Sequence, residues 1–258
     1  RVTLSRKTRV PSLLERFAWL PTEASYGLAD GNIYVGNQAL EPEVAYTLEA
    51  GADFNGEVFT FRPTAYYRRV DDFIQGTPFD ATIGVLDTPL EMVANMNGDP
   101  TPLKFRNVDA EFYGVDLDFS ARPAARIVID GTVNYVRGMR VDIDDDLYRI
   151  PPLNGRISLA YEGDRFVIGG ELTGATDQDA VSVSNDEDPS EGYLIAGAFA
   201  QFDLSDEVKI EAGVENVFDT FYQPHLAGRN RVGASDVPLG ERLPGYGRGV
   251  WIRASANF

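Results

Sequence analysis

The feature that most constrains this chain is a series of segments in which apolar and polar residues alternate. Between residues 44 and 54, every even position is apolar, whereas Thr47, Glu49, Gly51 and Asp53 occupy the odd positions from 47 to 53. This period of two predicts a β-strand with one apolar and one polar face. Several such segments exceed the five or six residues usual in soluble proteins. Strands of about nine to eleven residues suit a tilted crossing of a lipid bilayer.

About ten strands of this kind are expected along the chain. They cover Val2–Arg6, Val44–Phe54, Phe59–Tyr67, Tyr113–Phe119, Ile127–Tyr135, Ile157–Tyr161, Phe166–Leu172, Tyr193–Phe202, Val208–Val214 and Val250–Phe258. An aromatic content of 11% favours pleated strands over helices. The segment Tyr193–Phe202 is apolar at both odd and even positions, so the pattern does not assign its orientation.

The connections between the predicted strands alternate between short and long. Tight turns are expected at Asn55–Gly56, Arg122–Pro123, Gly163–Asp164 and Ser205–Asp206, and long connections at Lys7–Glu41, Gly76–Leu103, Arg140–Leu153, Thr176–Glu191 and Asp219–Gly247. Transmembrane barrels show this alternation because their strands run up and down through the bilayer. The predicted fold is an all-β, antiparallel up-and-down transmembrane β-barrel. The alternative is a soluble β-sandwich whose apolar face forms the core.

Composition excludes several functions. Acidic residues outnumber basic ones by 40 to 23, and a net charge of −17 argues against a nucleic-acid partner. The chain has no cysteine and one histidine, His225, so thiolate chemistry and sites with two imidazoles are excluded. No nucleophile motif surrounds any serine, so we expect neither an enzyme nor a cofactor. The chain begins at Arg1 without a signal peptide, which indicates a processed chain or a fragment.

Local motifs point to a family. The segment Arg9–Glu15 is followed by Gly36–Glu43, which reads GNQALEPE, and Tyr113–Asp118 reads YGVDLD. Asn216–Asp219 with Tyr222, and then Pro244–Arg248, precede the last strand. These motifs resemble G-N-x-x-L-x-P-E, the G-V-E strand, N-L-F-D-x-x-Y and P-G-R in the TonB-dependent outer-membrane receptors of Gram-negative bacteria. The terminal Phe258 is similar to the signal read by the barrel assembly machinery.

The resemblance implies that residues 1–258 are the C-terminal part of a 22-stranded barrel in the outer membrane, without the plug domain. It implies active import of a scarce nutrient, a ferric siderophore or other metal chelate. A copper, zinc, haem or cobalamin receptor and a passive porin are alternatives. Implied partners are the TonB–ExbB–ExbD complex through the plug, the barrel assembly machinery, lipopolysaccharide and lipid, and the metal chelate. Because ten strands alone would leave two open edges, we expect more chain in the full protein.

Candidate ligand-binding residues lie in the long connections. Arg229, Arg231 and Arg242 form a basic cluster in an acidic chain and could bind an anionic chelate, or could pair with acids of other loops. Met92 and Met96 could bind a soft metal together with His225. Their spacing of four residues also fits a loop helix that packs its apolar side, and His225 could be a loop-packing residue.

Two further expectations concern charged residues. Asp142, Asp144 and Asp146 alternate like calcium ligands, but Leu147 and Leu153 occupy positions where a calcium loop needs Gly and Glu. We therefore expect a solvated outer loop and no metal site. On the strands, apolar residues should face lipid because their polar neighbours need the aqueous lumen. The lipid-facing set is Leu48, Ile129, Ile210, Val214 and Ile252, and the luminal set is Glu49, Asp130, Glu211, Glu215 and Arg253.

Overall fold

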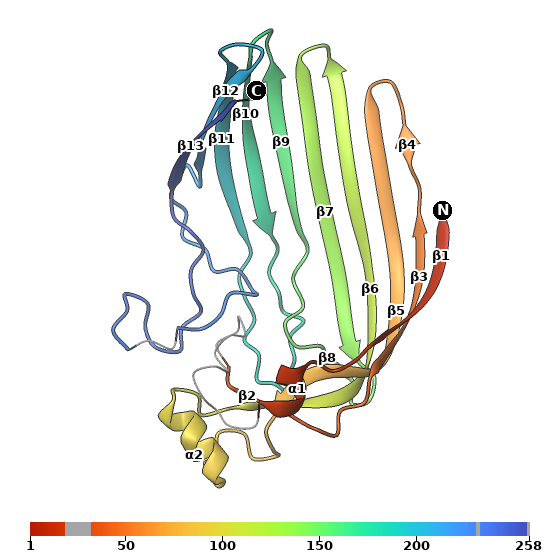
Figure 1. Cartoon of the computed structure of the whole chain (residues 1–258), viewed down its shortest axis with the longest axis vertical. Helices are drawn as coiled ribbons and strands as arrows, with labels where there is room; N and C mark the ends of the chain where they lie inside the picture. The colour runs from red at the N-terminus through yellow and green to blue at the C-terminus, as the bar shows by residue number, and fades with distance from the viewer. Residues whose placement is uncertain (19–31, 231–232, 257–258) are drawn as a thin grey trace.

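A computed structural model describes residues 1–18, 32–230 and 233–256, which form one curved, thirteen-stranded sheet (Figure 1). Ten long strands follow one another across it, each antiparallel to its neighbours. They are β1 (Val2–Arg9), β3 (Glu43–Gly51), β5 (Phe59–Pro78), β6 (Leu103–Ala124), β7 (Ile127–Arg140), β9 (Asn154–Glu162), β10 (Phe166–Ala175), β11 (Tyr193–Asp203), β12 (Val208–Glu215) and β13 (Gly249–Ala256). The predicted strands are therefore confirmed in number and order.

Short elements complete the structure. The strands β2 (Tyr34–Val35), β4 (Phe54–Asn55) and β8 (Asp145–Asp146) pair with β6, β5 and β7 respectively. The helices α1 (Leu13–Phe17) and α2 (Pro89–Met96) lie in the first two long connections. In the described residues, no helix is long and apolar enough to span a membrane.

One predicted turn is wrong. The expected turn at Arg122–Pro123 lies inside β6, and the chain reverses at Ala125–Arg126 instead. The register between β6 and β7 shifts between Ala121 and Ala124, which marks an irregularity containing the proline. Because proline lacks an N–H group, a bulge is a place where a strand tolerates it. The strands β5 and β6 also run beyond their predicted ends, towards the long connection between them.

The strand register divides the sheet into two faces, as the sequence predicts. One row of neighbours runs Ala121, Ile129, Leu159, Gly170, Ala198, Val214 and Val250, and the adjacent row runs Ser120, Asp130, Ser158, Glu171 and Gly197. All five predicted lipid-facing residues lie on the first face. This face is not covered by a second sheet in the described structure, and Ile252 is 77% exposed. The sandwich alternative is therefore wrong.

The register also assigns β11, whose orientation the sequence left open. Leu194, Ala196 and Phe202 lie in apolar rows, whereas Tyr193 and Phe199 lie in polar rows. The aromatic residues on the polar face have local partners. Phe199 covers Gly169, since a Cβ atom built at Gly169 would lie 2.4 Å from the Phe199 ring. The ring centroids of Tyr193 and Tyr222 lie 4.6 Å apart. Aromatic residues on the polar face thus cover glycine or another ring.

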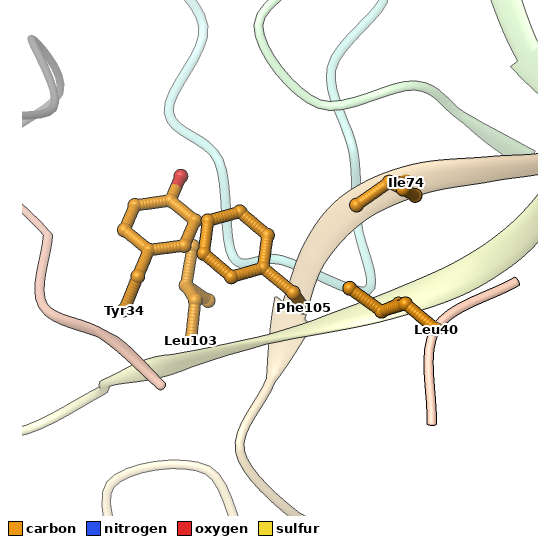
Figure 2. Packing of buried hydrophobic residues seen from close by; sticks show 5 residues of the cluster. All are labelled: Tyr34, Leu40, Ile74, Leu103 and Phe105. Carbon is orange, nitrogen blue, oxygen red and sulfur yellow. The ribbon is translucent and has the colours of Figure 1, made fainter. Parts of the chain in front are cut away.

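The buried core lies where β5 and β6 reach the long connections, rather than along the sheet. Figure 2 shows one cluster, in which Tyr34 stacks on Phe105 with ring centroids 4.8 Å apart. Leu40, Ile74 and Leu103 complete it. A second cluster joins Val70, Ala110 and Leu147. Because these residues come from several connections, the core fixes the loops relative to the strands.

The two N-terminal motifs, Arg9–Glu15 and Gly36–Glu43, contact each other in the structure. The Arg9 guanidinium donates to both carboxylate oxygens of Glu43, at 2.6 and 2.7 Å, and to Glu15 at 2.9 Å. The Gly36 N–H donates to the carbonyl of Ala18, and a Cβ atom at Gly36 would lie 2.7 Å from the Ala18 nitrogen. Only glycine allows this approach. The motifs therefore form a structural junction between β1, α1 and β3.

The two C-terminal motifs form a similar junction. Asn216 has a positive φ of 46°, and its side chain bonds the backbone N–H and carbonyl of Thr220 at 2.8 Å and the carbonyl of Tyr246 at 3.2 Å. Asp219 accepts the N–H of Arg248 at 2.8 Å. The start and the end of the connection between β12 and β13 are thus held together.

Candidate functional site: a cleft among the long connections

A cleft of about 420 Å³ lies among five long connections at one end of the sheet, and we call it the loop cleft; Asn32 lines it from the connection between β1 and β3. The connections between β7 and β9, β10 and β11, and β12 and β13 contribute its charged residues. These are Arg149, Asp186, Glu187, Asp188, His225, Arg229 and Arg242. The connection between β5 and β6 contributes the uncharged residues Gly98, Pro100 and Thr101, and β6 contributes Leu103. The cleft therefore combines three guanidinium groups with three carboxylates.

The structure brings two of the three predicted arginines together. Arg229 and Arg242 face each other in an isolated β-bridge. Arg229 forms an ion pair with Asp188 and donates to the carbonyl of Gly240 at 3.0 Å. Arg242 donates to the backbone carbonyls of Asp188, at 2.9 Å, and Pro189, at 3.3 Å. The expected loop-to-loop pairing is thus present for Arg229, and Arg231 lies outside the described residues.

Arg149 is a third cleft arginine that the sequence analysis missed. Its guanidinium donates to the carbonyl of Leu226 at 2.5 Å, across two connections. Within the described ranges, no carboxylate forms an ion pair with Arg149 or Arg242. Burial and the nearby Arg229 lower the pKa of Arg242, and Arg149 acts in the same direction. The cleft wall therefore places like charges near Arg242, and Asp188 and Glu187 act against their effect on its pKa.

His225 is buried between two connections. Its Nδ1 atom lies 3.0 Å from the Ser190 hydroxyl, and its Nε2 atom lies 3.3 Å from Glu187 Oε1 without forming a hydrogen bond. Glu187 accepts the N–H groups of Arg149 and Ser182, both at 2.9 Å. The loop-packing interpretation of His225 agrees with this burial. Glu187, which the sequence did not single out, is the residue that joins three connections.

The methionines lie away from this group. Met92 and Met96 are on α2, which begins with a capping box between Thr88 and Glu91. The helix was predicted, but the prediction that its methionine side packs against the loop is wrong. Met92 and Met96 are 50% and 84% exposed, whereas Glu91 and Ala94 are the buried residues of the helix. Neither methionine lines the loop cleft, so a joint metal site with His225 is not assembled in this structure.

Of the three aspartates expected in a solvated loop, Asp142 and Asp144 are exposed and Asp146 is half-buried. Asp142 pairs with Arg140 at 2.5 Å, and Asp146 pairs with Arg137 at 2.7 Å. In the same connection Asp145 accepts four hydrogen bonds from Ser182, Val183 and Ser184. Asp142 and Asp146 thus pair with arginines at the end of β7, and Asp145 joins this connection to the next one along the chain.

One further acidic group lies in the β5–β6 connection. Carboxylate oxygens of Asp80, Asp87 and Glu91 lie within 4.8 Å of one another, close enough to hold a cation. Glu91 is however buried and occupied by the cap of α2, and Asp80 accepts hydrogen bonds from Thr82. We therefore assign these acids to the local structure of the loop.

A curved antiparallel sheet with one exposed apolar face, one polar face and long connections at one end defines the class of outer-membrane β-barrels. The family "TonB dependent receptor-like, beta-barrel" matches residues 1–217. The chain belongs to this family, which confirms the resemblance seen in its motifs and favours a receptor over a passive porin. Its members are receptors and transporters rather than enzymes.

Solved structures give the same fold. The chain is similar to the copper transporter OprC (TM-score 0.82, 23% identity, covering 100% of this chain and 36% of that one). It is also similar to the FrpB iron transporter from Neisseria meningitidis (TM-score 0.61, 17% identity, covering 88% of this chain and 33% of that one). A third similar structure is the ferric enterobactin receptor PfeA from Pseudomonas aeruginosa (TM-score 0.65, 18% identity, covering 100% of this chain and 38% of that one). The chain thus spans between 33% and 38% of the length of these proteins. No curated protein sequence matches it.

Proposed function

We propose that this chain is part of a TonB-dependent receptor that imports an anionic metal chelate, such as a ferric siderophore, across the outer membrane. The observation that supports this most is the group of three guanidiniums, Arg149, Arg229 and Arg242, on the wall of the loop cleft. Arg149 and Arg242 are held by backbone carbonyls, which fix their geometry without neutralising their charge. A bound carboxylate or catecholate would relieve their mutual repulsion and accept paired hydrogen bonds.

Two of the similar structures support this class of ligand, a ferric enterobactin receptor and a siderophore receptor. Two others are a copper transporter and an iron transporter. We infer the remaining parts of the proposal from the family. The apolar face would contact lipid and lipopolysaccharide, a plug domain ahead of this segment would contact the TonB–ExbB–ExbD complex, and the barrel assembly machinery would insert the protein.

The test is ligand binding by the full-length receptor with Arg149→Ala and Arg242→Ala combined. We expect affinity for a ferric tris-catecholate to fall about tenfold or more, because two charge-assisted contacts are lost. Isothermal titration calorimetry would measure this. Arg126→Ala is the matched control, since Arg126 is exposed and pairs with Asp164 at the short-turn end of the sheet. Equal affinity in the double variant and the wild type would contradict the proposal.

A copper ligand is the second candidate, favoured by the exposed thioethers of Met92 and Met96. They lie four residues apart on α2 and so share one side of the helix. Thioethers are soft ligands that select Cu(I). If this candidate holds, Met92→Leu with Met96→Leu should weaken Cu(I) binding by the full-length receptor, whereas the arginine variants should not. If the methionine variants bind Cu(I) as the wild type does and the arginine variants lose affinity for the ferric tris-catecholate, the chelate proposal is supported instead.

A further inference from the structure

Three loops meet at a single carboxylate beside the loop cleft. Glu187, on the β10–β11 connection, accepts the N–H of Arg149 from the β7–β9 connection at 2.9 Å. Its Oε1 atom also lies 3.3 Å from Nε2 of His225, on the β12–β13 connection. The His225 and Glu187 side chains are only 1% and 7% exposed. The contact is therefore shielded from water, where a charge change has a large effect.

His225 is the chain's sole histidine, and histidine is the side chain that normally changes charge between pH 5 and 8. The neutral ring carries one N–H donor, whereas the protonated ring carries two. Its Nδ1 atom already contacts the Ser190 hydroxyl at 3.0 Å, and its Nε2 atom has no hydrogen-bond partner. In either neutral tautomer, protonation would place a positive charge on the ring next to Glu187. Acid therefore favours the arrangement in which the two loops are joined.

Other charges act on this contact from each neighbouring connection. The β7–β9 connection supplies Arg149 and Asp146, and the β10–β11 connection supplies Asp186 and Asp188 beside Glu187. The β12–β13 connection supplies Arg229 and Arg242. The arginines oppose a charge on His225 and the acids favour it. Among these groups, Glu187 is the carboxylate in direct contact with the ring.

We propose that His225 and Glu187 form a pH-sensitive latch beside the loop cleft, which at mildly acidic pH adds to the Arg229–Asp188 ion pair and the Arg242 hydrogen bonds that already join the β10–β11 and β12–β13 connections. The latch loosens as the imidazole loses its proton. The role of this latch in retaining a ligand rests on the proposed function. The loop motion itself does not, because it requires no ligand.

The test measures the distance between the two connections in the full-length receptor without ligand. The described chain has no cysteine, so Val183→Cys and Ala234→Cys, both at exposed positions, provide sites for nitroxide labels. Any cysteine elsewhere in the receptor is replaced by serine. Pulsed electron paramagnetic resonance then gives the distance distribution at about pH 8 and about pH 5.5. We expect the short-distance population to rise on the order of threefold at the lower pH.

Two variants identify the cause of that change. In His225→Gln and in Glu187→Gln the distribution should no longer respond to pH. A control label pair, Val183→Cys with Ile143→Cys, spans the connections that Asp145 joins, and should respond in neither background. A wild-type distribution that is independent of pH would overturn the latch, as would a pH response that both variants retain. A receptor whose distance distribution responds to pH but which binds no chelate would refute the proposed function and leave the latch standing.

Discussion

At the scale of single residues, the family motifs are explained by contacts rather than by ligand chemistry. Glu43, the last residue of GNQALEPE, accepts two hydrogen bonds from Arg9 and one from the backbone N–H of Ile74 at 2.9 Å. Its side chain is 11% exposed. One carboxylate thus joins β1, β3 and β5.

Removing this carboxylate's charge should destabilise the junction. We expect Glu43→Gln to lower the free energy of unfolding by about 1–3 kcal/mol, because Gln cannot accept both guanidinium bonds. The midpoint of denaturant unfolding, followed by tryptophan fluorescence, would measure it. Glu57→Gln is the control, since Glu57 is exposed in a turn. A midpoint unchanged from the wild type would show that the Arg9–Glu43 contact makes no net contribution to the free energy of unfolding.

Asp145 gives a pH-dependent prediction. Burial alone would raise the pKa of Asp145, but hydrogen bonds from the Ser184 hydroxyl and from the N–H groups of Ser184 and Val183 outweigh it and lower this pKa below 3.8. A carboxyl whose pKa is lowered by folding stabilises the structure above its unfolded pKa. That stabilisation is lost as the pH falls through the folded value.

We therefore expect the backbone amides of Val183 and Ser184 to be protected at pH above about 4 and to lose protection on further acidification. In Asp145→Asn, the protection should already be lower at neutral pH, by about tenfold. Hydrogen–deuterium exchange, corrected for the intrinsic rate at each pH, would measure this. Asp144→Asn is the control because Asp144 is exposed. Unaltered protection in Asp145→Asn would disprove the role of Asp145.

At the scale of strands, the two faces should differ in their tolerance of charge. On β7, Ile129 is the third residue after the turn, whereas Val133 lies further into the strand and Thr132 on the opposite face. Val133→Arg should cost about 2–4 kcal/mol because it faces the hydrocarbon core, and Ile129→Arg should cost less because it lies nearer the interface. Thr132→Arg should cost little. Unfolding in phospholipid vesicles would rank the three variants, and equal costs would contradict the assignment of faces.

Strand glycines make a second test at this scale. A Cβ atom at Gly114 would lie 2.4 Å from the carbonyl oxygen of Tyr135 and 2.5 Å from the Tyr66 hydroxyl. Overpacking of this kind costs about 1–3 kcal/mol. Gly114→Ala should lower the unfolding midpoint accordingly, whereas Gly170→Ala should not. A Cβ at Gly170 would meet only the carbonyl of Gly197, at 3.5 Å.

At the scale of the whole molecule, the described sheet has two open edges. Within the described residues, β1 pairs only with β3, and β13 only with β12. Open edges expose unpaired backbone groups that lipid cannot satisfy. A barrel in the membrane therefore requires both edge strands to be paired.

The terminal residue Phe258 lies outside the described residues, and its role as an assembly signal stays a prediction. Deleting it from the complete receptor should lower the yield of folded barrel in outer membranes, while the binding affinity of the barrel that does form stays unchanged. Heat-modifiable migration on gels measures the yield. Deletion of the exposed residue Gly233 from a loop is a suitable control. An undiminished yield would show that the assembly machinery reads another part of the chain.

The sequence by itself determined the order of the strands, their two faces and the alternation of short and long connections. These follow from a period of two, which depends only on whether each side chain faces lipid or water. It also determined the family, through motifs whose residues contact one another. The orientation of β11 needed the register, because small and aromatic residues on both faces leave no alternation.

Only the tertiary structure decided the composition of the loop cleft. Arg149, Glu187 and His225 lie on three connections, and no local pattern relates them in sequence. Their meeting depends on the order of strands in the sheet, which places the ends of β7, β9, β10, β11, β12 and β13 side by side (Figure 1). The same packing separated Met92 and Met96 from the cleft. Side chains far apart in the chain become partners only once the sheet fixes where their loops begin.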